Sequence, residues 1–308
     1  MRSLETAAAW DGSDLPTLFT LDAIAPMHYR SRHGDANLNG RAYGGQVLGQ
    51  TMMAAARTVD ADRPATAMQF LFLQGTLPEQ PVDFHVTALQ DGKRFSSRHV
   101  RGTQGGSRNV FDAHLTFAQP VEAPRHAART RAAETDPERL GRLVDMPRSW
   151  DAVFRSRLGG YSLTDKPGID FRVPDFDTQL DPATAGARIR FWMKTRRTLP
   201  AEPALHGAAF AYLSDWWLNF SSFAPHLREL DDERRLYVTS LNHGIWFHRP
   251  FHADEWLHVD SESPSADAGR GLSIGQVHDA QGELVATTLQ ESLMTYATPG
   301  TERRTRAA

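Results

Sequence analysis

The sequence predicts an α+β fold built from two similar units in tandem. Its 308 residues are enough for about two domains of ordinary size. In each half, a long helical stretch with one apolar face is followed by several short extended runs separated by turn residues. The order of elements repeats although the residues do not. Such a repeat favours two helix-plus-meander units that pack side by side.

The first unit opens with an extended segment near 18–32, which leads into a predicted helix. Within 42–59 apolar residues recur three and four positions apart, so one helical face is apolar. Gly44 and Gly45 stand at its start, where glycine permits close approach of another group. An Asp-Gly pair at 91–92 predicts a hairpin. The extended runs are expected at 68–73, 82–89, 95–102 and 110–117.

The second unit follows a connecting segment rich in Pro, Arg, Asp and Glu, in which a short helix is expected at 136–144. It should then contain a strand at 188–194 and a helix within 204–223. Further extended runs are expected at 236–241, 245–248, 256–263, 271–277 and 284–295. The predicted organisation is a first unit at 1–125, a connecting segment at 126–167, a second unit at 168–298 and a flexible tail at 299–308.

Composition excludes several classes of protein. The net charge of −3 does not favour binding to nucleic acid or to an anionic membrane. The absence of cysteine rules out disulfides, thiolate metal ligands and a cysteine nucleophile. No apolar run approaches the roughly 20 residues needed to span a bilayer, and the first residues make a poor signal peptide. A cytoplasmic protein is therefore expected.

Four segments, spread over both halves, carry a resemblance to a known family. They are AYGGQVLGQ at 42–50, DGKRFSSRHV at 91–100, NHGIWFHRPF at 242–251 and GELVATTLQESLM at 282–294. Together they resemble the acyl-CoA thioesterase II family, and the WFHRPF block with the LQE strand is specific. The resemblance implies a double hotdog, in which each long helix is wrapped by an antiparallel sheet. It also implies hydrolysis of acyl-CoA to a carboxylic acid and coenzyme A. The expected partners are an acyl-CoA substrate and further copies of the chain in a homo-oligomer.

The resemblance places an activated water between Asp215, Ser240 and Gln290, without a covalent intermediate. Ser240 stands where many relatives have Thr, and Asn242 where they often have Asp. The residue types suit the role, because burial among aromatic neighbours raises the pKa of a carboxylate and makes it a better base. A hydroxyl and an amide can each orient water. By themselves, however, these residues equally fit a helix cap at Asp215 and a solvent-facing Gln290.

Substrate contacts are expected at two places. The helix start with Gly44, Gly45 and Gln46 could approach the ligand closely. Arg249 and Arg270 lie near predicted turns or strand ends, where a cation could pair with a phosphate of coenzyme A. The alternative for each arginine is an ordinary solvated surface charge.

Other chemistries remain as alternatives. Gly271-Leu272-Ser273-Ile274-Gly275 matches the G-x-S-x-G elbow of serine hydrolases, but Ser273 lies inside an extended apolar run without a downstream helix. His248 and His252 have metal-ligand spacing, yet Pro250 between them breaks a helix, so neither a metal nor a cofactor is expected. A hotdog hydratase would need an Asp/His segment that the sequence lacks. A non-catalytic acyl-CoA binding protein and a purely structural oligomerisation module are the remaining alternatives, and polar residues inside the apolar strands disfavour the latter.

Overall fold

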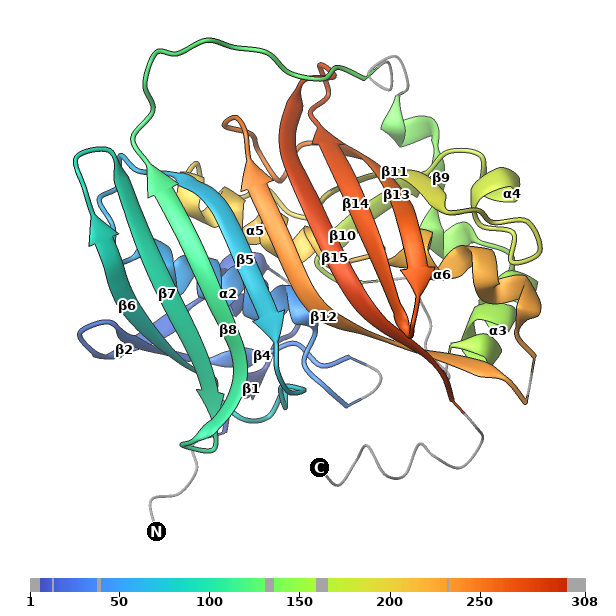
Figure 1. Cartoon of the computed structure of the whole chain (residues 1–308), viewed down its shortest axis with the longest axis horizontal. Coiled ribbons are helices and arrows are strands. Elements are labelled where there is room, and N and C mark those ends of the chain that lie inside the picture. The colour runs from blue at the N-terminus through green and yellow to red at the C-terminus, as the bar shows by residue number, and fades with distance from the viewer. Residues whose placement is uncertain are drawn as a thin grey trace.

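The computed structural model describes residues 6–12, 14–37, 40–130, 136–158, 166–231 and 233–297. The predicted tail, 299–308, lies outside these residues. The described chain forms a 13-stranded sheet, with a second sheet of two short parallel strands, β1 (Ala8–Ala9) and β4 (His33–Gly34). Figure 1 shows the large sheet as a continuous layer in front of the helices. Within the described residues, no helix is long and apolar enough to cross a membrane.

The first half combines one long helix with six strands of the large sheet. The helix is α2 (Gly44–Ala56). The strands are β2 (Leu21–Ala25), β3 (His28–Ser31), β5 (Ala65–Phe72), β6 (Asp83–Asp91), β7 (Phe95–Gln104) and β8 (Arg108–Ala118). The short helix α1 (Leu15–Leu18) precedes them, capped by the Asp14 side chain.

The second half repeats this arrangement. Its long helix is α5 (Pro203–Ser214), followed by the short helices α6 (Phe220–Phe223) and η4 (Ala224–Glu229). Its strands are β9 (Gly141–Arg142), β10 (Ile169–Val173), β11 (Arg188–Thr195), β12 (Arg235–Phe247), β13 (Leu257–Asp267), β14 (Arg270–His278) and β15 (Leu284–Ala297). Before and between them lie η2 (Pro137–Arg139), η3 (Leu143–Asp145), α3 (Arg148–Arg157) and α4 (Phe176–Gln179).

The strand order is nearly symmetric about its centre. It runs β2-β3-β6-β7-β8-β5 and then β12-β15-β14-β13-β11-β10-β9. At the centre β5 pairs with β12 in antiparallel fashion, with Gln69 opposite Gly244. The two predicted sheets therefore meet edge to edge and form one layer. This pairing satisfies the backbone groups that an open edge of each half would expose.

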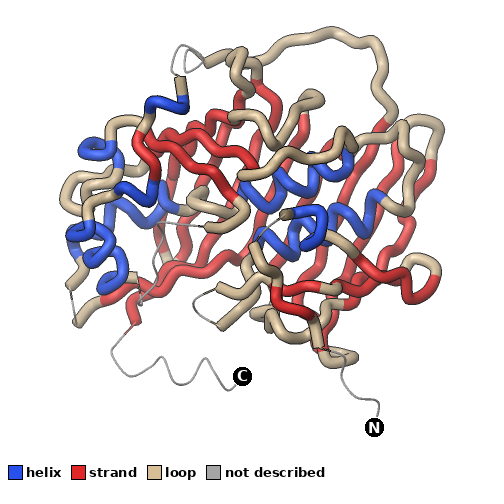
Figure 2. The backbone as a smooth tube through the Cα atoms, turned by 180° about the vertical axis from the view of Figure 1, so that it is seen from behind, coloured by secondary structure: helices blue, strands red, loops and turns tan. Residues whose placement is uncertain are grey.

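The two long helices lie side by side on one face of the sheet (Figure 2). They run antiparallel, because Gly44 lies against Asp215 at one end of the pair and Gly49 lies against the carbonyl of Ala208 further along. A Cβ on Gly49 would meet that carbonyl oxygen at 2.9 Å, so glycine allows the helices to approach closely. Strand residues that face the helices are buried, which follows from the period-2 alternation of side chains.

The predicted hairpin and turns are confirmed, whereas several predicted boundaries are wrong. The extended segment at 18–32 is a hairpin of β2 and β3, with Met27 at φ 61° between them. The helix expected at 136–144 is replaced by two 3-10 turns, and the α-helix comes later as α3. The helical region expected within 204–223 is divided into α5, which ends at Ser214, and α6, and Trp217 between them adopts φ 66°. The runs at 236–241 and 245–248 form one strand, β12.

Candidate active site

Asp215 lies where the end of α5 meets the start of α2. It follows the last helical residue of α5 as its C-cap, and a Cβ on Gly44 would come within 2.5 Å of its Oδ2 atom. The backbone N–H of Gly45 donates a hydrogen bond to the carboxyl group. A helix N-terminus carries partial positive charge, so the start of α2 favours the ionised carboxylate. Gly44 and Gly45, which are predicted to contact the substrate, lie against Asp215; their contact with substrate stays a prediction.

Gln290 joins Asp215 to Ser240 across the sheet. Its Nε2 atom donates to Asp215 Oδ1 at 2.7 Å and to Ser240 Oγ at 2.7 Å. Both acceptors fix the amide orientation, because the opposite orientation would bring Oε1 against the carboxylate. Within the described chain, no protein group donates to the buried Gln290 Oε1. The three residues that the sequence singled out therefore come together as one hydrogen-bonded group.

A bulge in β12 puts Ser240 on the face of the sheet that carries the helices. The register with β15 shifts between Ser240 and Asn242, so one extra residue is inserted there. Without it, Ser240 and His243 would point to opposite faces, because side chains alternate along a strand. On the outer face, Asn242 Nδ2 donates to Glu291 Oε2 at 2.8 Å. Asn242 therefore belongs to a surface pair and lies outside the Asp215 group.

Burial raises the pKa of Asp215 from 3.8 to about 7, because desolvation disfavours the charged form. Hydrogen bonds from Gly45, Gln290 and Ser240 act in the opposite direction, as does the positive charge of Lys166. Desolvation outweighs them. The carboxyl group is therefore partly ionised near neutral pH, which suits a group that accepts a proton from water and later returns it.

The structure separates the remaining predicted substrate contacts from this group. The Gln46 side chain is buried and binds the loop before α2, since its Oε1 accepts the Asp35 N–H at 2.6 Å. Arg249 Nη1 donates to Glu283 Oε2 at 2.5 Å. Arg270 lies 3.4 Å from Glu291 on the outer face of the sheet, opposite the helices. Both arginines thus have carboxylate partners on this chain.

Ser273 has none of the features of a serine nucleophile. It lies in the middle of β14, is fully buried, and accepts a hydrogen bond from Ser221 Oγ at 2.9 Å. Ser221 Oγ in turn lies 3.1 Å from Ser261 Oγ. A nucleophile needs an exposed turn and an adjacent base, and this cluster consists of hydroxyl groups in a packed layer. The G-x-S-x-G segment is therefore part of the packed strand β14 and does not form a nucleophile elbow.

Two residues beside the site were missed from the sequence. His243, directly opposite Gln290 in the β12–β15 pairing, lies 2.9 Å from Ser214 Oγ and 3.1 Å from Thr288 Oγ1 through Nε2. Burial lowers its pKa to about 3, so it is neutral at physiological pH. Lys166 is buried and comes from the connecting segment. A lone His or Lys without periodic context carries no sequence signal of such a position.

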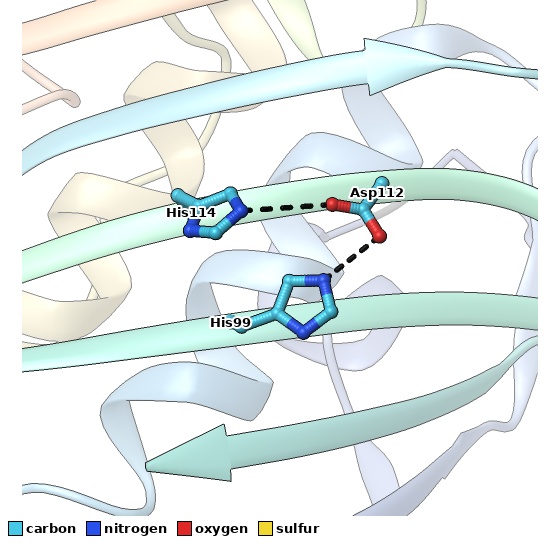
Figure 3. A group of neighbouring side chains, drawn as sticks. All are labelled: His99, Asp112 and His114. Atoms are coloured by element: carbon cyan, nitrogen blue, oxygen red, sulfur yellow. Dashed lines mark hydrogen bonds and ion pairs between the residues drawn. The ribbon is translucent and has the colours of Figure 1, made fainter. Parts of the chain in front are cut away.

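Two groups of possible metal ligands occur among the described residues. One unites His206, His252 and Asp254, so His252 approaches α5 while His248 binds Thr287 instead. The other is shown in Figure 3, where the rings of His99 and His114 both face Asp112 on the outer face of β7 and β8. Its distances are 2.8 Å for His99 and 3.8 Å for His114. Borderline divalent ions such as Zn²⁺ accept these donors. Neither group includes Asp215, Ser240 or Gln290.

Known proteins resemble this chain along nearly its whole length. Residues 172–293 match the family model of acyl-CoA thioesterase, and residues 32–118 match that of the acyl-CoA thioesterase N-terminal domain. Acyl-coenzyme A thioesterase 8 of Mus musculus is 28% identical over 90% of this chain and 88% of its own length. Acyl-CoA thioesterase 2 of Haemophilus influenzae is 26% identical over 92% and 98%.

A solved structure gives the same result for the fold. The acyl-CoA thioesterase II TesB2 from Mycobacterium marinum superposes with a TM-score of 0.72 at 31% identity, over 91% of this chain and 98% of that one. The two helix-bearing halves with a shared antiparallel sheet are thus a double hotdog. With both halves matched and the Asp215 group assembled on the helix-bearing face, the chain belongs to the acyl-CoA thioesterase II family and hydrolyses acyl-CoA thioesters.

Proposed function

We propose that acyl-CoA hydrolysis takes place at Asp215, Ser240 and Gln290, with water as the nucleophile. The observation that carries this proposal is the pair of 2.7 Å hydrogen bonds from Gln290 Nε2, which unite a carboxylate, a hydroxyl and an amide. These groups come from α5, β12 and β15 and lie within the layer between sheet and helices. Water bound to them would be held by both donors and acceptors.

In the proposed reaction, Asp215 takes a proton from the water as its oxygen attacks the thioester carbonyl. The tetrahedral intermediate then expels the coenzyme A thiolate, and the proton on Asp215 restores the thiol. The products are a carboxylic acid and coenzyme A. Gln290 and Ser240 orient the water, and the α2 N-terminus supplies a favourable potential for the negative charge that develops. Asp215 thus carries one proton from the water to the coenzyme A thiolate, and no other proton donor is needed.

One such site per chain is expected, because the first half lacks the corresponding residues. We also propose the organisation 1–125, 126–167 and 168–298 for the two hotdogs and their connection, and a homo-oligomer as the assembly. A cytoplasmic location stays a prediction. The acyl-CoA substrate itself follows from the family.

The test is release of free coenzyme A from acyl-CoAs of graded chain length, followed with a thiol reagent. Asp215→Asn, Gln290→Ala and Ser240→Ala should each impair the rate, while circular dichroism remains unchanged. Titration with a tight unreactive acyl-CoA analogue should find one site per chain. A full rate in folded Asp215→Asn would contradict the proposed site but leave the family activity standing.

A further inference from the structure

A buried ion pair lies next to the candidate site. Lys166 Nζ is 2.8 Å from Asp35 Oδ2 and 2.9 Å from Oδ1. The side chains are only 5% and 8% exposed. Removal of two charges from water is costly, and apolar side chains of similar volume often serve stability as well or better. Stability alone therefore does not explain this buried ion pair, and a functional role is expected.

Two tyrosines hold this pair in place. Lys166 Nζ lies 4.1 Å from the ring centroid of Tyr43, a cation–π contact. The Tyr212 hydroxyl donates to Asp35 Oδ2 at 3.0 Å, and the Tyr43 hydroxyl donates to the Tyr212 carbonyl at 2.8 Å. The two rings meet edge to face at 4.9 Å. The ion pair, the aromatic rings and the α5 backbone thus form one connected network.

This network ends at Asp215. Tyr212 lies three residues before Asp215 on α5, and Tyr43 is the N-cap of α2, two residues before Gly45, whose N–H binds the carboxyl group. Asp35 is tied to the same place, because its carbonyl accepts the Tyr43 N–H at 2.8 Å. Lys166 and Asp215 also attract one another electrostatically. Three distant parts of the chain therefore meet next to the Asp215 carboxyl group: the segment of Asp35 and Tyr43, Lys166, and the end of α5.

We propose that Lys166 is a positioning residue for hydrolysis: with Asp35 and the two tyrosines it locks the start of α2 against the end of α5, where Asp215 lies. Its positive charge also lowers the pKa of Asp215. This inference rests on the proposed role of Asp215 as the base. The connecting segment then supplies part of the active site as well as the link between the two hotdogs.

The charges around this carboxyl group determine the direction of each effect. The titratable groups around Asp215 and Lys166 are Asp35 before α2, Tyr43 at its start and Tyr212 on α5. Arg196, after β11, acts on Tyr212. Both tyrosines stay neutral, since burial raises their pKa well above the ordinary value. Among the charged groups, Lys166 lowers the pKa of Asp215, and the negative charge of Asp35 beside Lys166 opposes that effect.

The experiment is the pH profile of kcat/KM for three variants. Lys166→Met leaves Asp35 as an unpaired negative charge, so the acid limb should move to higher pH by about 0.5–1 unit. Asp35→Asn, which keeps the shape of the side chain, leaves Lys166 unpaired and should move the limb to lower pH by a similar amount. The double variant should return towards the wild-type limb. A purely structural role would lower the rate without opposite shifts.

Lys194→Met is the matched control. Lys194 also lies over an aromatic ring, that of Trp256 at 4.7 Å, and near a carboxylate, Glu138 at 3.7 Å. It belongs to β11, and its charge is not among those that shift the pKa of Asp215. Its limb should coincide with that of the wild type. Lys166→Arg, which keeps the charge, should also keep the limb.

The outcomes separate the two proposals. If Asp215→Asn retains the full rate, Asp215 is not the base and the proposed site is wrong. If Asp215→Asn is inactive but Asp35→Asn and Lys166→Met leave the limb in place or move it in the same direction, the inference about Lys166 is overturned. If Lys166→Met does not fold, the inference is tested by Asp35→Asn alone: a shift of its acid limb to lower pH supports the inference, and an unmoved limb overturns it.

Discussion

The two hotdogs share one architecture but differ in the chemistry of their buried layer. In the first half, the residues of β8 that face α2 are apolar; they are Phe111, Ala113, Leu115 and Phe117. In the second half, the residues of β15 that face α5 become polar after the first; they are Ala286, Thr288, Gln290 and Ser292. All eight are at most 1% exposed. The first half is thus a packed scaffold, whereas the second carries hydrogen-bonding groups in the same place.

The ends of the two long helices differ in the same way. Arg57 caps α2 and donates through Nη1 to the carbonyl of Leu21 at 2.9 Å, a contact that holds a strand in place. Asp215 caps α5 and faces Gln290, Ser240 and the α2 N-terminus. One fold therefore serves packing in one copy and, in our proposal, catalysis in the other. Polar substitutions at buried positions, rather than a different topology, distinguish them.

Loss of the base should have the largest effect. Asp215→Asn should lower kcat by about 10³-fold or more, because it removes the only carboxylate of the group and with it the proton acceptor. The measurement is coenzyme A release under saturating substrate. His114→Ala on the outer face of the first half is the control and should retain the wild-type rate. Equal losses in both variants would mean that the two halves do not differ as proposed.

Gln290→Ala should lower kcat by about 10²–10³-fold, since it removes a group that orients water and holds the carboxylate. Ser240→Ala should be impaired, while Ser240→Thr keeps the hydroxyl and should be tolerated. Ser273→Ala should keep most of its rate, because its hydroxyl serves only the buried serine cluster. A folded but inactive Ser273→Ala beside an active Gln290→Ala would favour an acyl-enzyme mechanism, which a fluorophosphonate label on Ser273 would reveal.

The rate should depend on pH through Asp215. Because burial raises its pKa to about 7, kcat/KM should fall about tenfold per unit below pH 7 as the base becomes protonated. The raised pKa also means that the stabilising contribution of this group is complete below about pH 4 and disappears as the pH rises through 7. Asp215→Asn should therefore gain stability relative to the wild type at pH 8. A wild-type profile that is flat between pH 5 and 8 would contradict this assignment.

Substitutions in the two halves should differ in what they lower: the free energy of unfolding in the first half, and the activity in the second. Phe111→Ala removes a fully buried ring of the first half and should cost about 3–5 kcal/mol in the free energy of unfolding. Gln290→Met keeps the side-chain volume but removes the hydrogen bonds to Asp215 and Ser240, so it should cost about 1–3 kcal/mol, less than Phe111→Ala, while activity is lost. Urea denaturation measures both. A larger loss of stability in Gln290→Met would make Gln290 chiefly structural.

Chelation should have the smallest effect. The Asp215 group offers one carboxylate, a hydroxyl and an amide, and the nearby positive charge of Lys166 disfavours a divalent cation. EDTA should therefore leave the rate unchanged. Zinc bound at His99, Asp112 and His114 would sit on the opposite face of the sheet, without contact to the site. A rate lost with EDTA and regained with zinc would sink the metal-free mechanism.

The sequence by itself determined the repeated order of elements and the candidate triad. Helical periodicity placed the long helix near its observed bounds at Gly44–Ala56, and the Asp-Gly pair at 91–92 marked the β6–β7 hairpin. These signals are local, because each depends on residues within one or two turns. The family motifs supplied Asp215, Ser240 and Gln290, whose types alone would equally have fitted a cap, a surface hydroxyl and a solvent-facing amide.

Only the tertiary structure decided how these parts meet. Asp215 and Gln290 are 75 positions apart, and strand pairing together with a bulge that the hydrophobic pattern does not predict brings them into contact. Lys166 and Asp35 are 131 positions apart and pair beside the place where the start of α2 meets the end of α5. Ser273 has a reactive motif but is buried in β14. A sequence pattern reports which face of an element is apolar, whereas the pKa of a carboxyl group depends on the charges and burial that distant segments bring to it.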